Sequence, residues 1–353
     1  MIRCLSPAPL FLLALAAWAQ QPSIRNARVE SHSAASGLEA AFHQAANGRA
    51  APVWIGYAVP IVKGDRSTCC SGWPHVCSLE SKSGDDSVSI ASSSAPVNLE
   101  GPDHLVVLYR VENGSAGKIR TFTPECTLDA GGLPFIWLTD VKPAESVAML
   151  SGMAKANSDE TSARHRGNSA IAALALHAEP SVDSALGQLA AAGNPEWQRK
   201  HAIFWMGEAR GHSGYEMLSR IVREDPSDRI REHAVFALTQ SKEPAAINDV
   251  IRVARDDQSA RVRSQALFWL AQRAAAKTAA SAIQDAITND PETEVKKKAV
   301  FALSQMRDGE GVPILIRVAR ENRNAEVRKQ AVFWLGQSKD PRALAFIEDI
   351  LKR

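Results

Sequence analysis

The chain has 353 residues, of which 45% are hydrophobic and 23% are charged. These proportions are ordinary for a soluble globular protein, and nothing in them demands disorder. The length is sufficient for two or three domains. The formal charge at pH 7 is +2, from 41 Lys and Arg against 39 Asp and Glu. The overall charge therefore favours neither a nucleic acid nor an acidic partner.

Residues 1–19 have the pattern of a secretory signal peptide. Arg3 gives the segment a basic N-terminus, and an apolar run follows over residues 10–17. Ala17-Trp18-Ala19 matches the A-x-A pattern of a cleavage site. The apolar run is much shorter than the roughly 20 residues that a membrane-spanning helix needs. We expect cleavage before Gln20 and export of the mature protein to the periplasm or the extracellular space, without membrane insertion.

Residues 20–155 are predicted to form a small α+β domain. Residues 51–62 and 104–111 are rich in the β-branched and aromatic residues that are typical of strands. The dipeptide Asn113-Gly114 follows the second of these runs and predicts the tight turn of a β-hairpin. Residues 36–46 have helical spacing after a Ser, so one helix is expected before the strands.

Four cysteines lie in this predicted domain, and an even number in an exported protein indicates two disulfides. The cysteines are Cys69, Cys70, Cys77 and Cys126. Four cysteines allow three pairings, and the sequence does not choose among them. We expect one of the first three to bridge to Cys126.

His75 lies between these cysteines and raises an alternative hypothesis. Thiolates and imidazole bind zinc, and a Cys beside a His can act as a nucleophile with its base. The spacing does not match the usual C-x2-C pairs of zinc sites, and disulfides would occupy the thiols. The alternative is therefore an enzyme with a Cys/His or zinc site here and the rest of the chain as its substrate-binding module. Our first expectation is no catalytic residue, metal or cofactor.

Residues 156–353 contain a segment that recurs about every 32 residues. It reads KHAIFWMGE, EHAVFALTQ, SQALFWLAQ, KKAVFALSQ and KQAVFWLGQ, beginning at residues 200, 232, 264, 297 and 329. A fainter copy, NSAIAALAL, begins at residue 168, and a second apolar segment follows each copy. The pattern predicts about six helical hairpins stacked into an all-α solenoid.

Helical spacing assigns each copy a buried stripe and an opposite face. At about 100° per residue, Val327, Ala331 and Leu335 share one face, which we expect to be the core. Phe333 falls at about 200° from Ala331 and therefore points away from that stripe. The same position holds a Phe in the four preceding copies.

Residues 325–351, AEVRKQAVFWLGQSKDPRALAFIEDIL, resemble the bacterial HEAT-like repeat first associated with phycobilisome lyases. That repeat has the pattern V-R-x-x-A-x-x-A-L-G followed by D-P-x-A-L, and the four preceding copies match it less closely. The resemblance implies a right-handed α-solenoid that binds other molecules, usually proteins, on a concave face lined by the Phe-bearing helices. It does not imply lyase activity, because the motif is architectural. Residues 20–155 resemble no family that we recognise.

We therefore predict an exported non-enzymatic scaffold or adaptor that binds a protein or peptide through the concave face of its solenoid. The predicted contact residues are an aromatic column and polar side chains beside it: Phe204, Phe236, Phe268, Phe301, Phe333, Lys297, Lys329, Gln240, Gln272 and Gln305. Two alternatives are open. The rings pack between neighbouring hairpins, or the N-terminal domain covers them.

Two further columns are predicted to be structural. They consist of Arg199, Arg231, Arg263 and Arg328, with Lys296 at the equivalent position, and of Trp205, Trp269 and Trp334. Each Arg lies near the core edge, where it can reach a carboxylate or carbonyl of an adjacent hairpin. The Trp residues alternate with Ala237 and Ala302, so large rings can pack over small residues. Nucleic-acid binding by the Arg column is disfavoured, because acidic residues are interspersed and the protein is expected to be exported.

Overall fold

The computed structural model describes residues 21–47, 49, 51–64, 68–70, 76–81, 102–155 and 160–352. The predicted signal peptide and His75 lie outside the described residues. The chain divides into two compact units, residues 1–179 and residues 180–353. Among the described residues, every helix is too short or too polar to cross a membrane.

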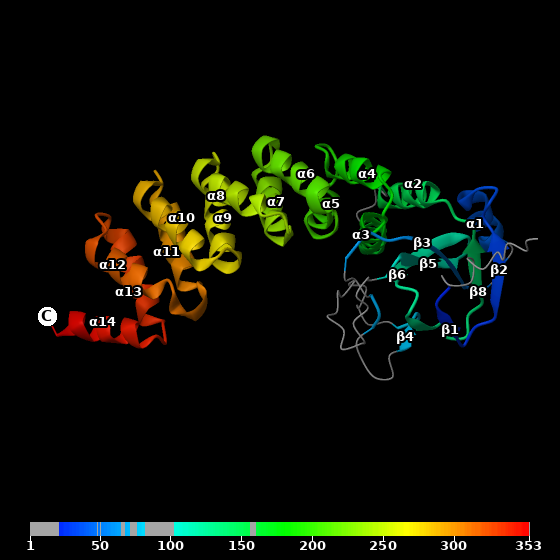
Figure 1. The fold of residues 1–353 in the computed structure, drawn as a ribbon, viewed down its shortest axis with the longest axis horizontal. Helices are drawn as coiled ribbons and strands as arrows, with labels where there is room; N and C mark the ends of the chain where they lie inside the picture. Colours follow the sequence, from blue (N-terminus) through cyan, green and yellow to red (C-terminus); the bar gives the residue numbers. More distant parts are fainter. Residues whose placement is uncertain are drawn as a thin grey trace, which may run out of the picture. The chain divides into compact units, whose positions relative to one another are not determined.

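The first unit contains a five-stranded mixed sheet (Figure 1). Its order is β2 (Val29–Ser33), β8 (Phe135–Thr139), β3 (Val53–Pro60), β5 (His104–Glu112) and β6 (Ser115–Phe122). The first three strands run parallel, and β3, β5 and β6 are antiparallel neighbours. The predicted hairpin is confirmed, because Glu112 pairs with Ser115 around Asn113 and Gly114, whose φ angles of 53° and 71° suit the left-handed turn.

Helices cover one face of this sheet and a small second sheet covers the other. The helices are α1 (Leu38–Ala46), α2 (Pro143–Ala154) and α3 (Thr161–Ala175), and the second sheet is β1 (Ser23–Arg25), β7 (Thr127–Asp129) and β4 (Val76–Ser78). Phe42 of α1 meets the ring of Tyr109 at 5.2 Å, whereas Trp54 packs toward Leu128 of β7 in a buried cluster. The α+β prediction is therefore confirmed. Helix α3 packs against α2 and β6 within this unit, whereas the sequence analysis assigns it to the repeats.

Two disulfides join the four cysteines of this unit. Cys69 pairs with Cys126, which directly precedes β7, and Cys70 pairs with Cys77 in β4. The first bridge links residues 57 positions apart, and the second links residues 7 apart. Both β4 and β7 belong to the small sheet, so the bridges lie around its edge strand and its central strand.

The second unit is a row of helical hairpins. Its helices are α4 (Ser181–Ala190), α5 (Glu196–Ala209), α6 (Gly211–Glu224), α7 (Asp228–Gln240), α8 (Ala245–Asp256), α9 (Ala260–Arg273), α10 (Ala276–Asn289), α11 (Thr293–Ser304), α12 (Val312–Glu321), α13 (Ala325–Gly336) and α14 (Pro341–Leu351). The Phe-bearing segments lie on the odd-numbered helices. The predicted core stripe is confirmed, because Val327 and Ala331 are fully buried and Leu335 is 1% exposed.

The odd-numbered helices form the inner row of this unit. Consecutive members from α5 to α13 pack closely on one another, whereas α6, α8 and α10 make fewer contacts with their neighbours in the even-numbered row. In a curved stack the more tightly packed row lies on the inside, because the outer row must spread. Figure 1 shows the even-numbered helices α6, α8, α10 and α12 along the opposite edge of the row.

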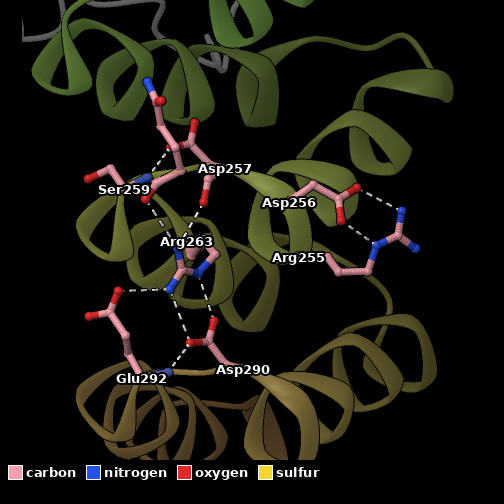
Figure 2. Close-up of polar contacts among 8 residues, drawn as sticks. Arg255, Asp256, Asp257, Ser259, Arg263, Asp290 and Glu292 are labelled. Atoms are coloured by element: carbon pink, nitrogen blue, oxygen red, sulfur yellow. Dashed lines mark hydrogen bonds and ion pairs between the residues drawn. The ribbon is translucent and has the colours of Figure 1, made fainter.

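A column of buried ion pairs runs through the connections between hairpins. Asp225, Asp257 and Asp290 each cap the end of an even-numbered helix. Arg231 donates to the Asp257 carboxylate at 2.8 and 2.9 Å and to the carbonyl of Asp225 at 2.9 Å. Arg263 repeats the arrangement with Asp290, at 2.7 and 3.1 Å, and with the carbonyl of Asp257, at 2.8 Å (Figure 2).

The same column includes Arg199, which pairs with Asp225 and donates to the carbonyl of Ala190 at 2.7 Å. Each arginine therefore contacts two connections. One precedes its own helix, and the other follows the next even-numbered helix. Such charge-assisted bonds satisfy the buried carboxylates and carbonyls of the turns. The aspartates were missed in the sequence analysis, although the letters DPS, DQS and DPE recur at the repeat period from residues 225, 257 and 290.

The last connection departs from this pattern. Lys296 and Asn322 occupy the positions of the arginine and the aspartate, so the carboxylate is replaced by a neutral amide. The ammonium of Lys296 donates to the carbonyl of Thr288 at 3.0 Å, and Asn322 Oδ1 accepts the backbone N–H of Asn324 at 2.9 Å. Arg328 donates to the Asn322 carbonyl at 2.7 Å. The positive charge of Lys296 is thus not balanced by a buried aspartate.

Candidate functional site

Five phenylalanines, one on each inner helix from α5 to α13, form the candidate site. Phe204, Phe236, Phe268 and Phe301 are partly buried, and Phe333 is 54% exposed. The rings are therefore neither sealed between hairpins nor fully exposed to solvent. Their position opposite the buried alanine stripe explains why part of each ring stays accessible.

The phenylalanine and tryptophan rings make one continuous aromatic column. Phe204 stacks on Phe236 at 6.2 Å between ring centroids with an interplanar angle of 15°, and Phe268 stacks on Phe301 at 6.2 Å and 6°. The other links between hairpins are Phe236 to Trp269 at 4.7 Å and Phe301 to Trp334 at 4.9 Å. Within their own helices, Trp205, Trp269 and Trp334 contact the preceding Phe at 5.5, 5.2 and 5.0 Å.

The three tryptophans differ in what their indole N–H groups contact. Trp205 is 5% exposed, and its Nε1 donates to His201 Nε2 at 3.4 Å. The Nε1 atoms of Trp269 and Trp334 are buried and find no hydrogen-bond partner within the part of the chain that the structure describes. An unpaired buried donor costs about 1–3 kcal/mol, so these two indole groups carry a cost that Trp205 does not.

The polar residues predicted to flank the aromatic column fall into two groups. Lys297 and Lys329 lie at the rim and pair with Glu294 at 2.9 Å and Glu326 at 3.0 Å, respectively. The glutamines join neighbouring hairpins: Gln272 Nε2 donates to the Gln305 carbonyl at 3.3 Å, and Gln240 Oε1 accepts from Arg273 at 3.3 Å. The lysines thus leave their charge at the surface, whereas these glutamine contacts link the inner helices.

A cavity of about 390 Å³ opens beside the aromatic column between α11 and α13. Its lining consists of Glu294, Lys297, Lys298, Phe301, Gln330 and Trp334. Two rings therefore provide an apolar wall, and two lysines and an amide provide hydrogen-bond donors. Trp334 also lines a second cavity, of about 440 Å³, whose lining includes Gln305, Met306 and Gln337.

A buried chain of polar side chains in the first unit was missed in the sequence analysis. Tyr109 Oη lies 2.8 Å from Tyr57 Oη, which lies 2.7 Å from Ser146 Oγ, and this hydroxyl lies 2.8 Å from His177 Nε2. His177 Nδ1 is 2.7 Å from the carbonyl of Ala173 and donates to it, because a carbonyl oxygen only accepts. No local motif marks this chain, because each member comes from a different segment.

A serine hydroxyl within hydrogen-bond distance of an imidazole nitrogen is also the arrangement of a nucleophilic serine and its base. Here, however, Ser146, His177, Tyr57 and Tyr109 are all 0% exposed. Burial raises the pKa of Tyr57 to about 12 and also raises the pKa of Tyr109, so both phenols stay protonated. These four hydrogen-bonded side chains satisfy one another inside the core, where a substrate has no access to them.

The Cys/His alternative concerns the cysteines of the first unit. All four form the two disulfides described above, so none is a free thiol in this structure. Within the described ranges, no three His, Cys, Asp or Glu side chains come together as a metal site requires. His75 lies outside those ranges, and its role remains a prediction.

Comparison with known proteins identifies the helical repeats. The HEAT repeat family matches residues 183–271 and 272–353. The complex of CpcE and CpcF of phycocyanin lyase from Nostoc sp. PCC7120 is similar over 56% of this chain and 77% of that chain, with 17% identity and a TM-score of 0.32. Human deoxyhypusine hydroxylase in complex with glycerol is similar over 59% of this chain and 90% of that chain, with 15% identity and a TM-score of 0.25. No curated protein matches the chain. Residues 183–353 are HEAT repeats, and this part of the chain forms a HEAT-repeat solenoid.

Proposed function

We propose that this protein is a non-enzymatic scaffold or adaptor that binds a protein or peptide partner through the inner row of its HEAT repeats. The aromatic column is the contact surface. The observation that carries the proposal is the partial exposure of the same ring position on successive inner helices, ending at Phe333, which is 54% exposed. Rows of accessible aromatic rings with polar edges are typical of protein-binding surfaces.

The geometry of the column supports an extended partner rather than a compact small molecule. The rings follow one another across five inner helices at centroid distances of 4.7 to 6.2 Å. A surface of this kind offers repeated apolar contacts along a line. Lysines at its rim, such as Lys297 and Lys329, add polar contacts that fix the orientation of a partner.

Site-specific photo-crosslinking in the native cell envelope tests this proposal. A photoreactive phenylalanine analogue at Phe268 is expected to give discrete crosslinked species, because that ring is partly accessible on the inner row. The matched control places the same analogue at Ser281, which is exposed on α10 in the outer row. Equal crosslinking at the two positions, or none at Phe268, would contradict binding through the aromatic column.

We also propose that the mature protein is exported and acts in the periplasm or outside the cell. The signal-peptide pattern of residues 1–19 and the two disulfides support this location, because disulfides persist in oxidising compartments. Mass spectrometry of the protein from the periplasmic and extracellular fractions is expected to find a mature chain that begins at Gln20. Recovery only from the cytoplasm, with Met1 retained, would contradict export.

A further inference from the structure

The charge beside the aromatic column is concentrated on one inner helix. Two positions precede the buried alanine of every repeat, and they hold Lys and His in α5, Glu and His in α7, Ser and Gln in α9, Lys and Lys in α11, and Lys and Gln in α13. Only α11 has two lysines there, and both line the 390 Å³ cavity. The surface therefore has its strongest positive charge at one place along the column.

The neighbouring Lys296 adds a further positive charge to α11. In the three preceding connections the basic residue of the ion-pair column faces a buried aspartate, but Lys296 faces the position of the neutral Asn322. Lys296 donates to the carbonyl of Thr288 instead. Lys297 pairs with Glu294, and Glu326 pairs with Lys329 and also feels the charge of Lys297. The four lysines of this region, Lys296, Lys297, Lys298 and Lys329, therefore outnumber these two carboxylates. A partner that carries acidic groups would complement this excess charge.

The wall of the cavity favours a ligand that is also apolar. Phe301 and Trp334 contact each other at 4.9 Å and form the aromatic side of the cavity. Gln330, which precedes Trp334 by one turn of α13, adds an amide to the same lining. An acceptor-rich group next to an apolar side chain would match the amide and lysine donors as well as the rings.

We infer that the groove between α11 and α13 binds an acidic peptide segment, with a large apolar side chain against Phe301 and Trp334 and carboxylates on Lys297 and Lys298. This inference rests on the proposed function and specifies the partner of the same surface. Glu294 already places a carboxylate on Lys297, with its Oε1 atom 2.9 Å from the lysine Nζ. Its side chain is 73% exposed, so this pair is weak and exchangeable with a carboxylate of the peptide.

Fluorescence anisotropy with the full chain tests the inference with defined probes. The probe is a labelled peptide of alternating Glu and Leu, compared with versions that carry Gln or Lys in place of Glu and with a proline-rich peptide. We expect the Glu version to bind at least about tenfold more tightly than the Gln version at low salt, and to lose affinity as salt rises. Tighter binding of the Lys or proline-rich peptide, or no binding of the Glu peptide, would overturn the inference.

Matched variants locate the binding to this groove. The double variant Lys297→Glu and Lys298→Glu is expected to weaken binding of the Glu peptide by at least about tenfold, because two favourable charges become repulsive. Lys277→Glu, an exposed change on α10 in the outer row, is the control and should leave affinity unchanged. Glu294→Gln should tighten binding by about threefold, because Lys297 loses its internal competitor. Equal effects of the α10 and α11 charge reversals would overturn the inference.

The proposed function and the acidic peptide can fail separately. If the photoreactive analogue at Phe268 still crosslinks a partner while the Glu peptide does not bind, the surface binds partners of another chemistry and only the inference is wrong. If both fail, the proposed function is wrong as well. Trp334→Phe reduces the apolar wall of the cavity, and is expected to weaken binding of the Glu peptide while leaving the helical circular dichroism unchanged.

Discussion

Two columns of side chains run through the same HEAT repeats, and their environments differ. The arginine–aspartate column lies in the connections between hairpins, where Arg231 and Arg263 are 3% and 5% exposed and the aspartates accept several hydrogen bonds. The aromatic column lies on the inner helices, where the rings are partly accessible and two indole donors lack partners among the described residues. The charged groups of the first column are paired within the protein, whereas the rings of the second column keep accessible surface.

This difference shows how a repeated sequence separates architecture from recognition. A residue type that recurs at the repeat period can serve either purpose, so recurrence alone does not distinguish them. The saturation of hydrogen bonds and the exposed area do distinguish them. A buried charge must be paired inside the fold, whereas a half-exposed ring gains by burial against another molecule.

Breaking the ion-pair column should give the largest effect. Arg263→Leu leaves the Asp290 carboxylate and the carbonyl of Asp257 buried without their donor, so we expect the free energy of unfolding to fall by about 3–5 kcal/mol. The measurement is urea denaturation followed by circular dichroism.

The control for this change is visible beside it in Figure 2. Arg255 and Asp256 also form a bidentate pair, at 2.8 Å, but their side chains are 63% and 52% exposed. Arg255→Leu should therefore cost less than about 1 kcal/mol. Similar losses for the two variants would mean that burial does not distinguish these ion pairs.

Disrupting the aromatic column should give an intermediate effect. Phe268 and Phe301 stack at 6.2 Å, so a double-mutant cycle with alanine at both positions should show a coupling of about 0.5–1.5 kcal/mol in the free energy of unfolding. The same cycle with Phe268 and Phe333, which lie on α9 and α13, should show almost none. A coupling of several kcal/mol for the first pair would indicate that the rings are core rather than a surface with contacts left to make.

Protonation of a histidine beside the aromatic column should give the smallest effect. The ring centroid of His233 lies 6.0 Å from that of Phe236, and its Nε2–H donates to the carbonyl of Lys200 at 2.9 Å. Burial, and to a lesser degree the charge of Lys200, lowers its pKa below the ordinary value of 6.5, against the opposing effects of this hydrogen bond and Glu232. In contrast, hydrogen bonding to Asp290 raises the pKa of Arg263, which stays charged.

The sign of the pH dependence follows from the lowered pKa of His233. The unfolded chain takes up the proton near pH 6.5 and the folded chain only at lower pH, so the stability contributed by neutral His233 is complete above 6.5 and is lost as pH falls through the folded value. His233→Gln places in α7 the residue that α9 has at its equivalent position, Gln265. Urea denaturation at pH 7 and pH 5 should show a smaller acid loss in this variant. An unchanged acid loss would assign it to other groups.

Much of the fold could be predicted from short-range patterns. The buried stripe of Val327, Ala331 and Leu335 follows from helical spacing, and the hairpin at Asn113 and Gly114 follows from turn chemistry. The column of phenylalanines was also visible, because their spacing relative to the alanine is fixed within one helix. These features depend on neighbours within a few residues.

The remaining features join residues far apart in the chain. The pairing of Cys69 with Cys126, the partners of Arg263 and the buried chain from Tyr109 to His177 all depend on which segments the fold brings together. The degree of ring exposure has the same origin, because it is decided by the distance between neighbouring inner helices.

The sequence by itself determined the repeat period, the helical hairpins and the face on which each aromatic ring lies. Only the tertiary structure decided which charges are buried and paired, which indole donors have no acceptor among the described residues, and that a cavity with two lysines opens between α11 and α13. The physical reason is that secondary structure responds to local periodicity, whereas burial and hydrogen-bond saturation depend on contacts between helices whose spacing no single repeat specifies.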